Sequence, residues 1–397
     1  MTAERDGNGS RPRPAEPEGV EVLWYLTGPD GRAPWSASGS RKIDLPYLRQ
    51  VAGAVDQLGY TGALLATGAH DTWVLGSSLI TATERMRFLI AVHPPLISPV
   101  LAAKMATTFD QFSDGRLILN IVNGATQQLR GFGSTLGHDE RYAHTDEWIP
   151  VWRAAAAGAP LDFEGDYVTA QGPPLPLPAV QAPTPPLWFG GSSPAALRTA
   201  AKHIDTYLSW GEPPPQTAER IAHLRTLAAE YGRTLRFGIR LYLLVRDTDE
   251  QAWAEANRLL RTMDSEVVEK MQRIFKGTDS VGQQRMLALH GGRVPDDARE
   301  LEVYPDLWAG LGLVRPGPGT AIVGSPETVL ARIQEYRDAG ISTFIVSGIP
   351  LLEEAYRVAE TILPHLPVTY GSTTARDADV DASAFAWTNL TKEGTLR

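Results

Sequence analysis

The feature that most constrains the fold is an alternation of short apolar runs with amphipathic helical patterns along most of the 397 residues. The runs that predict strands are 20–26, 62–67, 86–94, 117–124, 186–191, 206–211, 237–245, 320–324 and 342–348. The patterns that predict helices are 44–60, 72–84, 99–113, 144–158, 194–203, 215–232, 249–263, 266–277, 325–340 and 352–366. Because strand and helix alternate about eight times, the sequence predicts a parallel α/β domain, a (β/α)8 TIM barrel rather than an open doubly wound sheet.

The predicted barrel is a single domain over residues 20–368. Barrels of this type need about 250 residues, so the excess is expected in insertions. The two longest stretches without a regular alternation, 125–185 and 264–319, are the expected insertions. Residues 1–19 predict a disordered extension and 369–397 a loose tail, because both are poor in apolar residues.

Charge and cysteine content exclude several classes of protein. The net charge of -9 argues against nucleic acid or an anionic membrane as the main partner, although it permits a small anionic substrate. The chain has no cysteine, which removes disulfides, thiol nucleophiles and cysteine metal sites and fits a cytoplasmic protein. No apolar run approaches the roughly 20 residues that span a bilayer, and the first residues do not resemble a signal peptide.

Metal and triad chemistry are not indicated either. The eight histidines are scattered without a paired ligand spacing, so no metal site is expected. No G-x-S-x-G elbow, Walker loop or G-x-G-x-x-G turn is present. In a barrel, functional side chains instead collect where strands end and loops begin, so the strand ends are where a site is expected.

The stretch FGIRLYLLV (237–245) places a charge inside an otherwise apolar strand. Its odd positions form a continuous apolar face, whereas Arg240 and Tyr242 share the other face. A buried guanidinium without a partner is costly, so Arg240 should have an anionic or strongly polar partner. Two readings are open: a structural ion pair, or an arginine that faces a cavity and binds an anionic ligand.

Other strand ends carry weaker signals. FGGSSP ends a strand with Gly190 to Ser193 and begins a helix at Pro194, which suits either a phosphate or an ordinary capped helix. HDERY (138–142) places Arg141 and Tyr142 ahead of a helix, where a solvated loop is the alternative. His93 is either a packed histidine or a catalyst.

The segment TDSVGQQRMLALHGG (278–292), followed by 307–324, predicts a mobile lid. The segment ends in RPGPG, so Arg315 lies at a hinge-like position. The alternative is a surface loop whose arginine is in water.

Several of these motifs together resemble one family. TGALLATG, ATTFDQFSDGRLILNIVNG, HDERY, PPLWFGGSS, DTYLSWGEPP, RFGIRLYLLVRDTDEQAW and LWAGLGLVRPGPGTAIVG are similar to the alkanesulfonate monooxygenases, which are bacterial-luciferase-like flavin monooxygenases. The resemblance runs from about residue 20 to 368. SVGQQRM, SWGEPP and LEEAYRV are specific to that subgroup.

The resemblance implies a luciferase-like TIM barrel that uses reduced FMN (FMNH2) from a separate NAD(P)H-dependent flavin reductase, together with O2. The substrate would be a small organosulfonate, cleaved at its C–S bond to give sulfite and an aldehyde. A cytoplasmic homo-oligomer, a dimer or tetramer, would be expected.

The resemblance also implies roles for individual residues. Arg240 and Arg315 would hold the sulfonate, Trp210 would form a wall of the pocket, and Tyr242 would occupy the position of a family histidine. The cofactor side would comprise His93, Asn123, Tyr142, Gly191, Ser192 and Ser193. Of these, Ser192, Ser193 and Tyr142 would grip the phosphate, and Asn123 would lie near the flavin ring.

The sequence departs from the family at positions associated with proton transfer. Besides Tyr242 for histidine, Ile349 and Leu351 replace a tyrosine and a histidine in SGIPLL. The cysteine usual near Gly68 and the histidine usual in the first strand's loop have no counterpart. These departures leave alternatives open: oxygenation of a non-sulfonate substrate by N- or C-hydroxylation or sulfone cleavage, a deazaflavin-dependent reductase, or a non-catalytic flavin-binding barrel.

Overall fold

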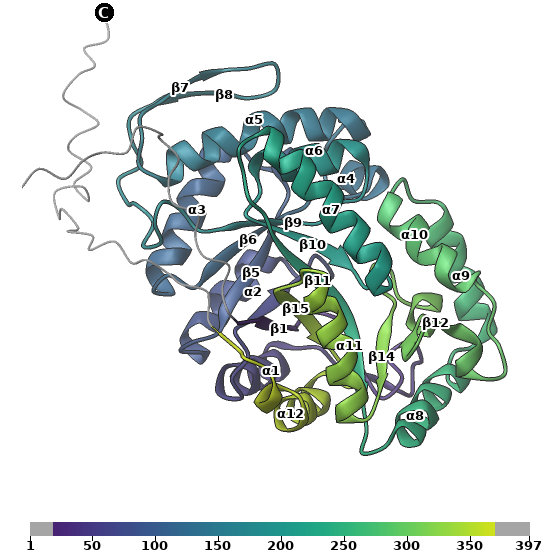
Figure 1. Cartoon of the computed structure of the whole chain (residues 1–397). Coiled ribbons are helices and arrows are strands. Elements are labelled where there is room, and N and C mark those ends of the chain that lie inside the picture. The colour runs from purple at the N-terminus through teal and green to yellow at the C-terminus, as the bar shows by residue number, and fades with distance from the viewer. Residues whose placement is uncertain (1–18, 370–397) are drawn as a thin grey trace, which may run out of the picture.

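A closed barrel of eight parallel strands forms the centre of the computed structural model, which describes residues 19–369 (Figure 1). The strands are β1 (Glu21–Tyr25), β4 (Gly62–Leu65), β5 (Arg87–Val92), β6 (Leu117–Ile121), β9 (Leu187–Phe189), β10 (Thr206–Trp210), β11 (Arg236–Val245) and β15 (Thr343–Ser347). Each pairs with the next in this order, and β15 pairs with β1 to close the sheet. The predicted fold class is therefore confirmed. The predicted tails fall mostly on residues 1–18 and 370–397, which lie outside the described part.

A ring of helices surrounds the barrel (Figure 1). These are α1 (Leu45–Gln57), α2 (Thr72–Leu79), α3 (Pro99–Phe112), α5 (His138–Ala156), α6 (Pro194–His203), α7 (Pro214–Glu230), α11 (Pro326–Asp338) and α12 (Leu351–Thr361). Many begin at a side chain that accepts a backbone N–H of the first turn, as Asp44, Ser98 and Ser325 do. Such caps satisfy donors that the helix itself leaves free, so the strand-to-helix turns are fixed locally.

The barrel interior is filled by one inward-facing side chain from nearly every strand. These are Leu23, Leu64, Leu89, Ile118, Trp188, Leu208 and Ile345. The inward position on β11 at this level is Gly238, where a Cβ would lie 2.7 Å from a Leu208 methyl. Since inward positions recur every second residue, Arg240 and Tyr242 occupy the next levels toward the carboxyl end of β11.

One predicted strand lies outside the barrel. β14 (Ala321–Gly324) pairs with Tyr242–Val245, beyond the part of β11 that pairs with β10. It continues through antiparallel pairing into β13 (Leu307–Trp308) and β12 (Glu302–Tyr304). The reason is the length of β11, which projects past its barrel neighbours and offers a free edge.

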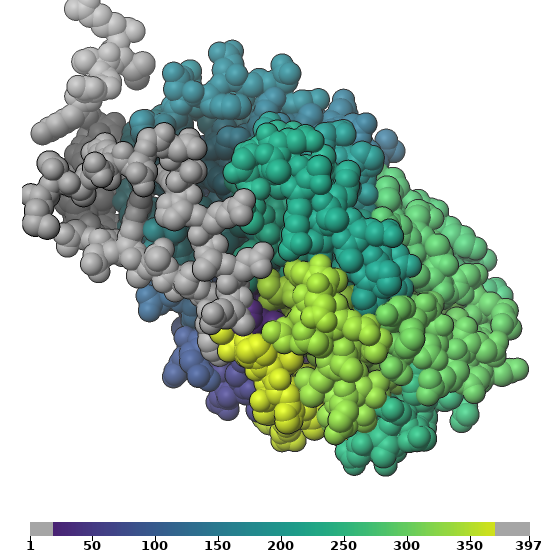
Figure 2. Space-filling view, in the orientation of Figure 1, coloured from purple at the N-terminus to yellow at the C-terminus, as the bar shows by residue number. Residues whose placement is uncertain are grey.

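The segment between β11 and β14 is largely helical. It contains α8 (Asp249–Arg261), α9 (Ser265–Lys276) and α10 (Val281–His290), which lie in a row along one side of the barrel and form a continuous surface next to α7 (Figures 1 and 2). The other elements are α4 (Thr126–Gly131), a hairpin of β2 (Asp30–Gly31) with β3 (Ser40–Arg41), and a hairpin of β7 (Leu161–Glu164) with β8 (Thr169–Gly172). Short 3-10 turns occupy Ile80–Ala82, Pro94–Leu96, Ala298–Leu301, Gly310–Leu313 and Leu363–His365.

Two predicted helix boundaries were wrong. α2 ends at Leu79 rather than near 84, and the Thr83 hydroxyl bonds to the Leu79 carbonyl that a continued helix would use. α5 begins at His138 rather than 144, because Glu140 accepts the Gly137 N–H and closes the first turn. HDERY is therefore the start of a helix. Within residues 19–369, no helix is both long and apolar enough to cross a bilayer.

Candidate active site

Arg240 lies inside the barrel near its carboxyl end, between two aromatic rings. Its Cζ is 4.6 Å from the ring centroid of Tyr25 on β1 and 4.5 Å from that of Tyr242. Its guanidinium donates to the Leu241 carbonyl at 2.5 Å and to the Ser347 hydroxyl at 2.8 Å. The side chain is only 6% exposed, and no carboxylate of residues 19–369 forms an ion pair with it. The ion-pair alternative therefore has no partner in the described chain.

Arg315 reaches the same place from the loop after the Gly310–Leu313 turn. It donates to the Pro29 carbonyl at 3.2 Å, while its Nε is buried without a partner among residues 19–369. Gly28 makes room for it: a Cβ there would lie 2.8 Å from Arg315 Nη2 and 2.6 Å from the Tyr25 ring. The structure thus brings together two arginines that are far apart in sequence, and their role as sulfonate ligands stays a prediction.

Tyr242 lies between these two cations. Burial raises the pKa of its phenol, but the positive charges of Arg315 and Arg240 outweigh burial, and the net effect is a lowered pKa. In return, Tyr242 raises the pKa of the Arg240 guanidinium, but burial has the larger effect and lowers this pKa overall. The three side chains form a cluster with two permanent positive charges and one ionisable phenol.

Trp210 ends β10 level with Arg240 and lies under the first turn of α10. A Cβ on Gly282 would be 3.0 Å from the Trp210 ring, and Gly317 adopts a positive φ of 77° beside the same ring. The Gly317 N–H donates to Gln283 Oε1 at 2.8 Å, which joins α10 to the RPGPG loop. Trp210 is therefore a wall between the barrel mouth and the 264–319 segment.

An ion pair also joins α10 to the barrel. Arg285 donates to Glu212 at 2.6 Å, just after β10. Glu212 in turn pairs with buried Arg220 of α7.

Arg141 of α5 donates hydrogen bonds to Asp279, just before α10, at 3.3 Å and to the Thr126 hydroxyl at 2.8 Å. Since Arg141 is 1% exposed, the solvated-loop alternative for HDERY is wrong for this residue.

Asn123 provides an unused hydrogen-bond donor where β6 leads into its loop. Its Oδ1 accepts the Thr145 hydroxyl at 2.8 Å, whereas its Nδ2 is buried and has no partner in the described part of the chain. The side chain is 4% exposed. An unmade hydrogen bond of a buried amide is costly, so a ligand that accepts from Nδ2 would gain from it. His93, at the end of β5, is half-buried, and burial lowers the pKa of its imidazole.

The turn between β9 and α6 gathers the predicted phosphate-binding residues. Ser193 caps α6 by accepting the Ala196 N–H at 3.2 Å. Tyr142 of α5 packs edge-on to Phe189 with centroids 6.5 Å apart, and burial raises the pKa of its phenol, opposed by the Ser193 hydroxyl. The Gly191 carbonyl accepts a hydrogen bond from the Tyr207 hydroxyl at 2.8 Å. Burial raises the pKa of the Tyr207 phenol, and the Ser192 hydroxyl opposes this rise. The ordinary helix cap is thus present, and phosphate binding stays a prediction.

Sequence reasoning missed several contributors to the cluster and its cover. Tyr25 and Ser347 each end a barrel strand, and that position is a signal already present in the sequence. Gln283 and Gly282 gave no such signal. Gln283 is 4% exposed, and its Nε2 is buried without a partner within residues 19–369. Its bond to the Gly317 N–H joins two distant segments and therefore depends on tertiary packing.

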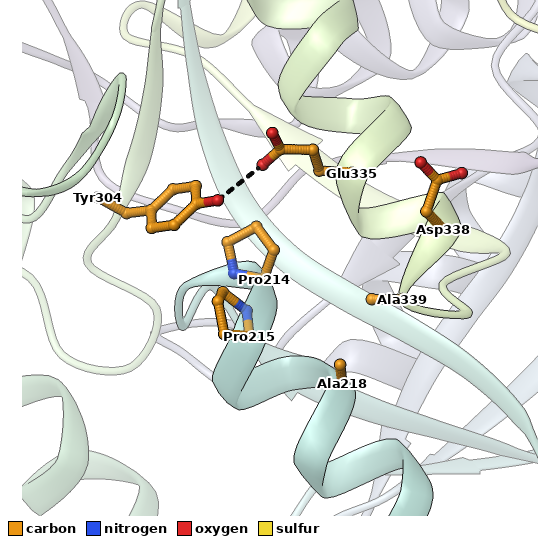
Figure 3. Close-up of a pocket in the computed structure, with 7 residues that line it drawn as sticks. All are labelled: Pro214, Pro215, Ala218, Tyr304, Glu335, Asp338 and Ala339. Atoms are coloured by element: carbon orange, nitrogen blue, oxygen red, sulfur yellow. Dashed lines mark hydrogen bonds between the residues drawn. The ribbon is translucent and has the colours of Figure 1, made fainter.

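A shallow pocket of about 330 Å³ lies elsewhere, between the first turn of α7 and the last turns of α11 (Figure 3). It is lined by Pro214, Pro215, Ala218, Tyr304, Glu335, Asp338 and Ala339. Glu335 accepts hydrogen bonds from Tyr304 at 3.1 Å and from Arg332 at 2.8 Å. None of the predicted site residues lines this pocket. In the described chain, no three potential metal-ligating side chains lie together.

A closed parallel barrel with polar and charged side chains at the carboxyl ends of its strands is the architecture of TIM-barrel enzymes. The chain belongs to the luciferase-like monooxygenase family, whose model matches residues 24–343.

Three solved structures share the fold. A long-chain alkane monooxygenase (LadA) is 18% identical with a TM-score of 0.74, and a riboflavin lyase (RcaE) with modified FMN and riboflavin is 18% identical with a TM-score of 0.72. Each match covers 90% of this chain and 94% of the other. DmoA from Hyphomicrobium sulfonivorans is 17% identical with a TM-score of 0.71 and 87% of both chains covered.

Proposed function

We propose that this protein is the oxygenase of a two-component system that uses FMNH2 and O2 to cleave the C–S bond of an organosulfonate, releasing sulfite and an aldehyde. The observation that carries the proposal is the pair Arg240 and Arg315, which meet at the barrel mouth without a carboxylate partner in residues 19–369. A sulfonate is a permanent oxyanion that accepts several charge-assisted hydrogen bonds. One buried and one half-buried guanidinium suit that head group.

The residues at the mouth also suit a flavin. Asn123 offers a buried amide donor that nothing in the described chain accepts. Gly190 is exposed at the end of β9. A Cβ at this position would lie 2.9 Å from the Leu208 carbonyl, so a residue other than glycine would collide with the neighbouring strand β10. The α6 N-terminus, Tyr142 and Ser193 would hold the phosphate. The riboflavin lyase with its modified FMN shows that this fold accommodates such a group in a relative.

Reduced FMN, when bound, supplies the two electrons that send one oxygen atom of O2 to water while the other ends in the aldehyde. The protein's part is binding, orientation and exclusion of water. Arg240 and Arg315 hold the sulfonate, and Trp210 under α10 shields the mouth. In this proposal a separate NAD(P)H-dependent reductase provides FMNH2, and the oxygenase is a cytoplasmic dimer or tetramer.

The apolar neighbours of the cluster favour a second candidate, oxygenation of a less usual substrate. Ile349 is 6% exposed and packs in the same apolar cluster as Tyr242 and Val314. This lining suits an apolar substrate tail and does not by itself require a sulfonate. Hydroxylation without C–S cleavage would then be the reaction.

Sulfite release decides between the two candidates. The protein is supplied with a flavin reductase, NAD(P)H, FMN and a panel of alkyl, aryl and sugar sulfonates, and sulfite is measured by a thiol-reactive dye. Release that requires FMNH2 and is lost in Arg240→Ala supports the proposal, with Arg293→Ala, a 76% exposed arginine side chain, as control. No sulfite from any sulfonate, with flavin binding intact, rejects it, and mass spectrometry then tests for an inserted oxygen.

A further inference from the structure

We propose that Tyr242 and a bound oxyanion compete for the guanidinium groups of Arg240 and Arg315, so that oxyanion binding is coupled to proton uptake by Tyr242. The inference deepens the proposed function and rests on it only for the class of ligand, a sulfonate or similar oxyanion. It assigns Tyr242 a specific role, that of a replaceable counter-ion which becomes a hydrogen-bond donor once the ligand is bound.

The charge balance of the cluster leads to this proposal. Arg240 is buried and Arg315 half-buried at the barrel mouth, and within residues 19–369 they donate hydrogen bonds to neutral groups: the carbonyls of Leu241 and Pro29 and the hydroxyl of Ser347. Neutral acceptors do not compensate two desolvated charges. Two ionisable phenols, Tyr25 and Tyr242, lie against Arg240, and Tyr242 interacts with both guanidiniums, whose charges lower its pKa.

The carboxylate that acts on the cluster, Asp30, is already hydrogen-bonded to other groups. The charge of Asp30 favours the charged form of Arg315. The Asp30 carboxylate is nevertheless 1% exposed and accepts hydrogen bonds from Arg41, Tyr47 and the Leu351 N–H. Asp30 therefore supports the turn that carries the Pro29 carbonyl. Tyr25 faces Arg240 with its ring, and its phenol favours the charged form of both Arg240 and Arg315. From β15, the neighbour is the Ser347 hydroxyl, which does not titrate in this range.

Tyr242 differs from the other buried or half-buried tyrosines. Burial raises the pKa of Tyr47, Tyr60, Tyr142, Tyr207 and Tyr336. Tyr242 is 3% exposed, yet its pKa is lowered by the two arginines. Since a shift of this sign in a buried phenol requires uncompensated positive charge, the site is already arranged to hold an anion.

A ligand oxyanion would supply the missing negative charge in place of the phenolate. The pKa of Tyr242 then rises, because the guanidiniums are neutralised and burial alone remains. Between the pKa of the free protein and that of the complex, binding takes up as much as one proton, and the affinity falls about tenfold per pH unit as pH increases. The neutral phenol can then donate a hydrogen bond to the oxyanion.

The test follows the phenolate absorbance of the folded protein as a function of pH, with methanesulfonate as the probe and sodium chloride of equal ionic strength as the control. The difference between wild type and Tyr242→Phe isolates this residue, and Tyr25→Phe is the matched tyrosine control. We expect the Tyr242 phenolate to form below the pH range of an ordinary tyrosine, and methanesulfonate to move its formation to higher pH. Arg315→Gln should move it in the same direction without a ligand.

A Tyr242 signal at the ordinary pH, or one that methanesulfonate does not move, overturns the inference. A second measurement is calorimetry of methanesulfonate binding in two buffers of different ionisation enthalpy, which should show proton uptake in wild type and none in Tyr242→Phe. Neither readout needs turnover. Sulfite release can therefore fail while the coupling is observed, and the coupling can fail while sulfite is released.

Discussion

Gly282 in the first turn of α10 lies directly against the indole of Trp210 at the end of β10. A Cβ at position 282 would be 3.0 Å from the ring, closer than a side chain ordinarily approaches. The contact places the 264–319 segment on the wall of the barrel mouth. α10 is further joined to the barrel through Arg285 and Glu212, so its position and the shape of the site are linked.

Replacing Gly282 should therefore disturb the site without removing a functional group. In Gly282→Val the added atoms push α10 away from Trp210, and we expect kcat/KM to fall roughly ten- to a hundredfold. Steady-state kinetics with a responsive substrate measures this. Gly277→Ala in the neighbouring turn is the control, because a Cβ there meets only atoms at 3.5 Å or more. Equal kinetics for both variants would contradict the link.

The Glu212 carboxylate should contribute more to stability than its exposed partner. Glu212→Ala leaves Arg220, which is 7% exposed, with an uncompensated charge, and we expect the free energy of unfolding to fall by about 3–5 kcal/mol. Arg285→Ala removes an arginine whose side chain is 41% exposed and should cost no more than about 1 kcal/mol. Urea denaturation distinguishes the two, and similar losses would show that Arg220 finds another partner.

The two arginines of the cluster should determine substrate affinity. A hydrogen bond to a charged group is worth about 1.5–3 kcal/mol, so Arg240→Ala and Arg315→Ala should each raise KM for a responsive sulfonate roughly ten- to a hundredfold. Arg240→Lys keeps the charge but loses the forked geometry and should fall between alanine and wild type. Michaelis kinetics measures this. An unchanged KM in both alanine variants would show that the two arginines do not hold the sulfonate.

Asn123 should contribute to flavin affinity through its free amide. Asn123→Ala removes the buried donor, and we expect the dissociation constant of FMN to rise by about fivefold to tenfold, the value of one hydrogen bond. Thr145→Val, which removes only the hydroxyl that orients the amide, should have a smaller effect. Flavin fluorescence titration measures both, and wild-type affinity in Asn123→Ala would place the flavin elsewhere.

His290 should make the protein sensitive to mild acid. Burial lowers the pKa of its imidazole from 6.5 to about 4, and its Nδ1 accepts the Gly292 N–H at 3.1 Å. Between these pH values the unfolded chain binds the extra proton, so stability is full above pH 6.5 and falls by about 3 kcal/mol as pH drops to 4. Urea unfolding at several pH values should show a shallower loss in His290→Gln, and an identical pH profile would exclude this group.

Much of the fold could be predicted because its determinants are local. The alternation of apolar runs and helical patterns indicated the parallel barrel, and side chains such as Asp44, Ser98 and Ser193 mark helix starts by their own hydrogen bonds. The period of two along β11 placed Arg240 and Tyr242 on one face. What local patterns could not predict was that β14 lies outside the barrel, since that depends on which edges remain free after closure.

The sequence by itself determined which side chains would sit at the carboxyl ends of the strands, because strand period and strand end are short-range properties. Only the tertiary structure decided that Arg240 has no carboxylate partner in the described chain, that Arg315 meets it across Tyr242, and that α10 rests on Trp210. Pairing, burial and the pKa of a phenol depend on groups that arrive from distant segments. These properties are therefore set only when the folded chain brings those segments together.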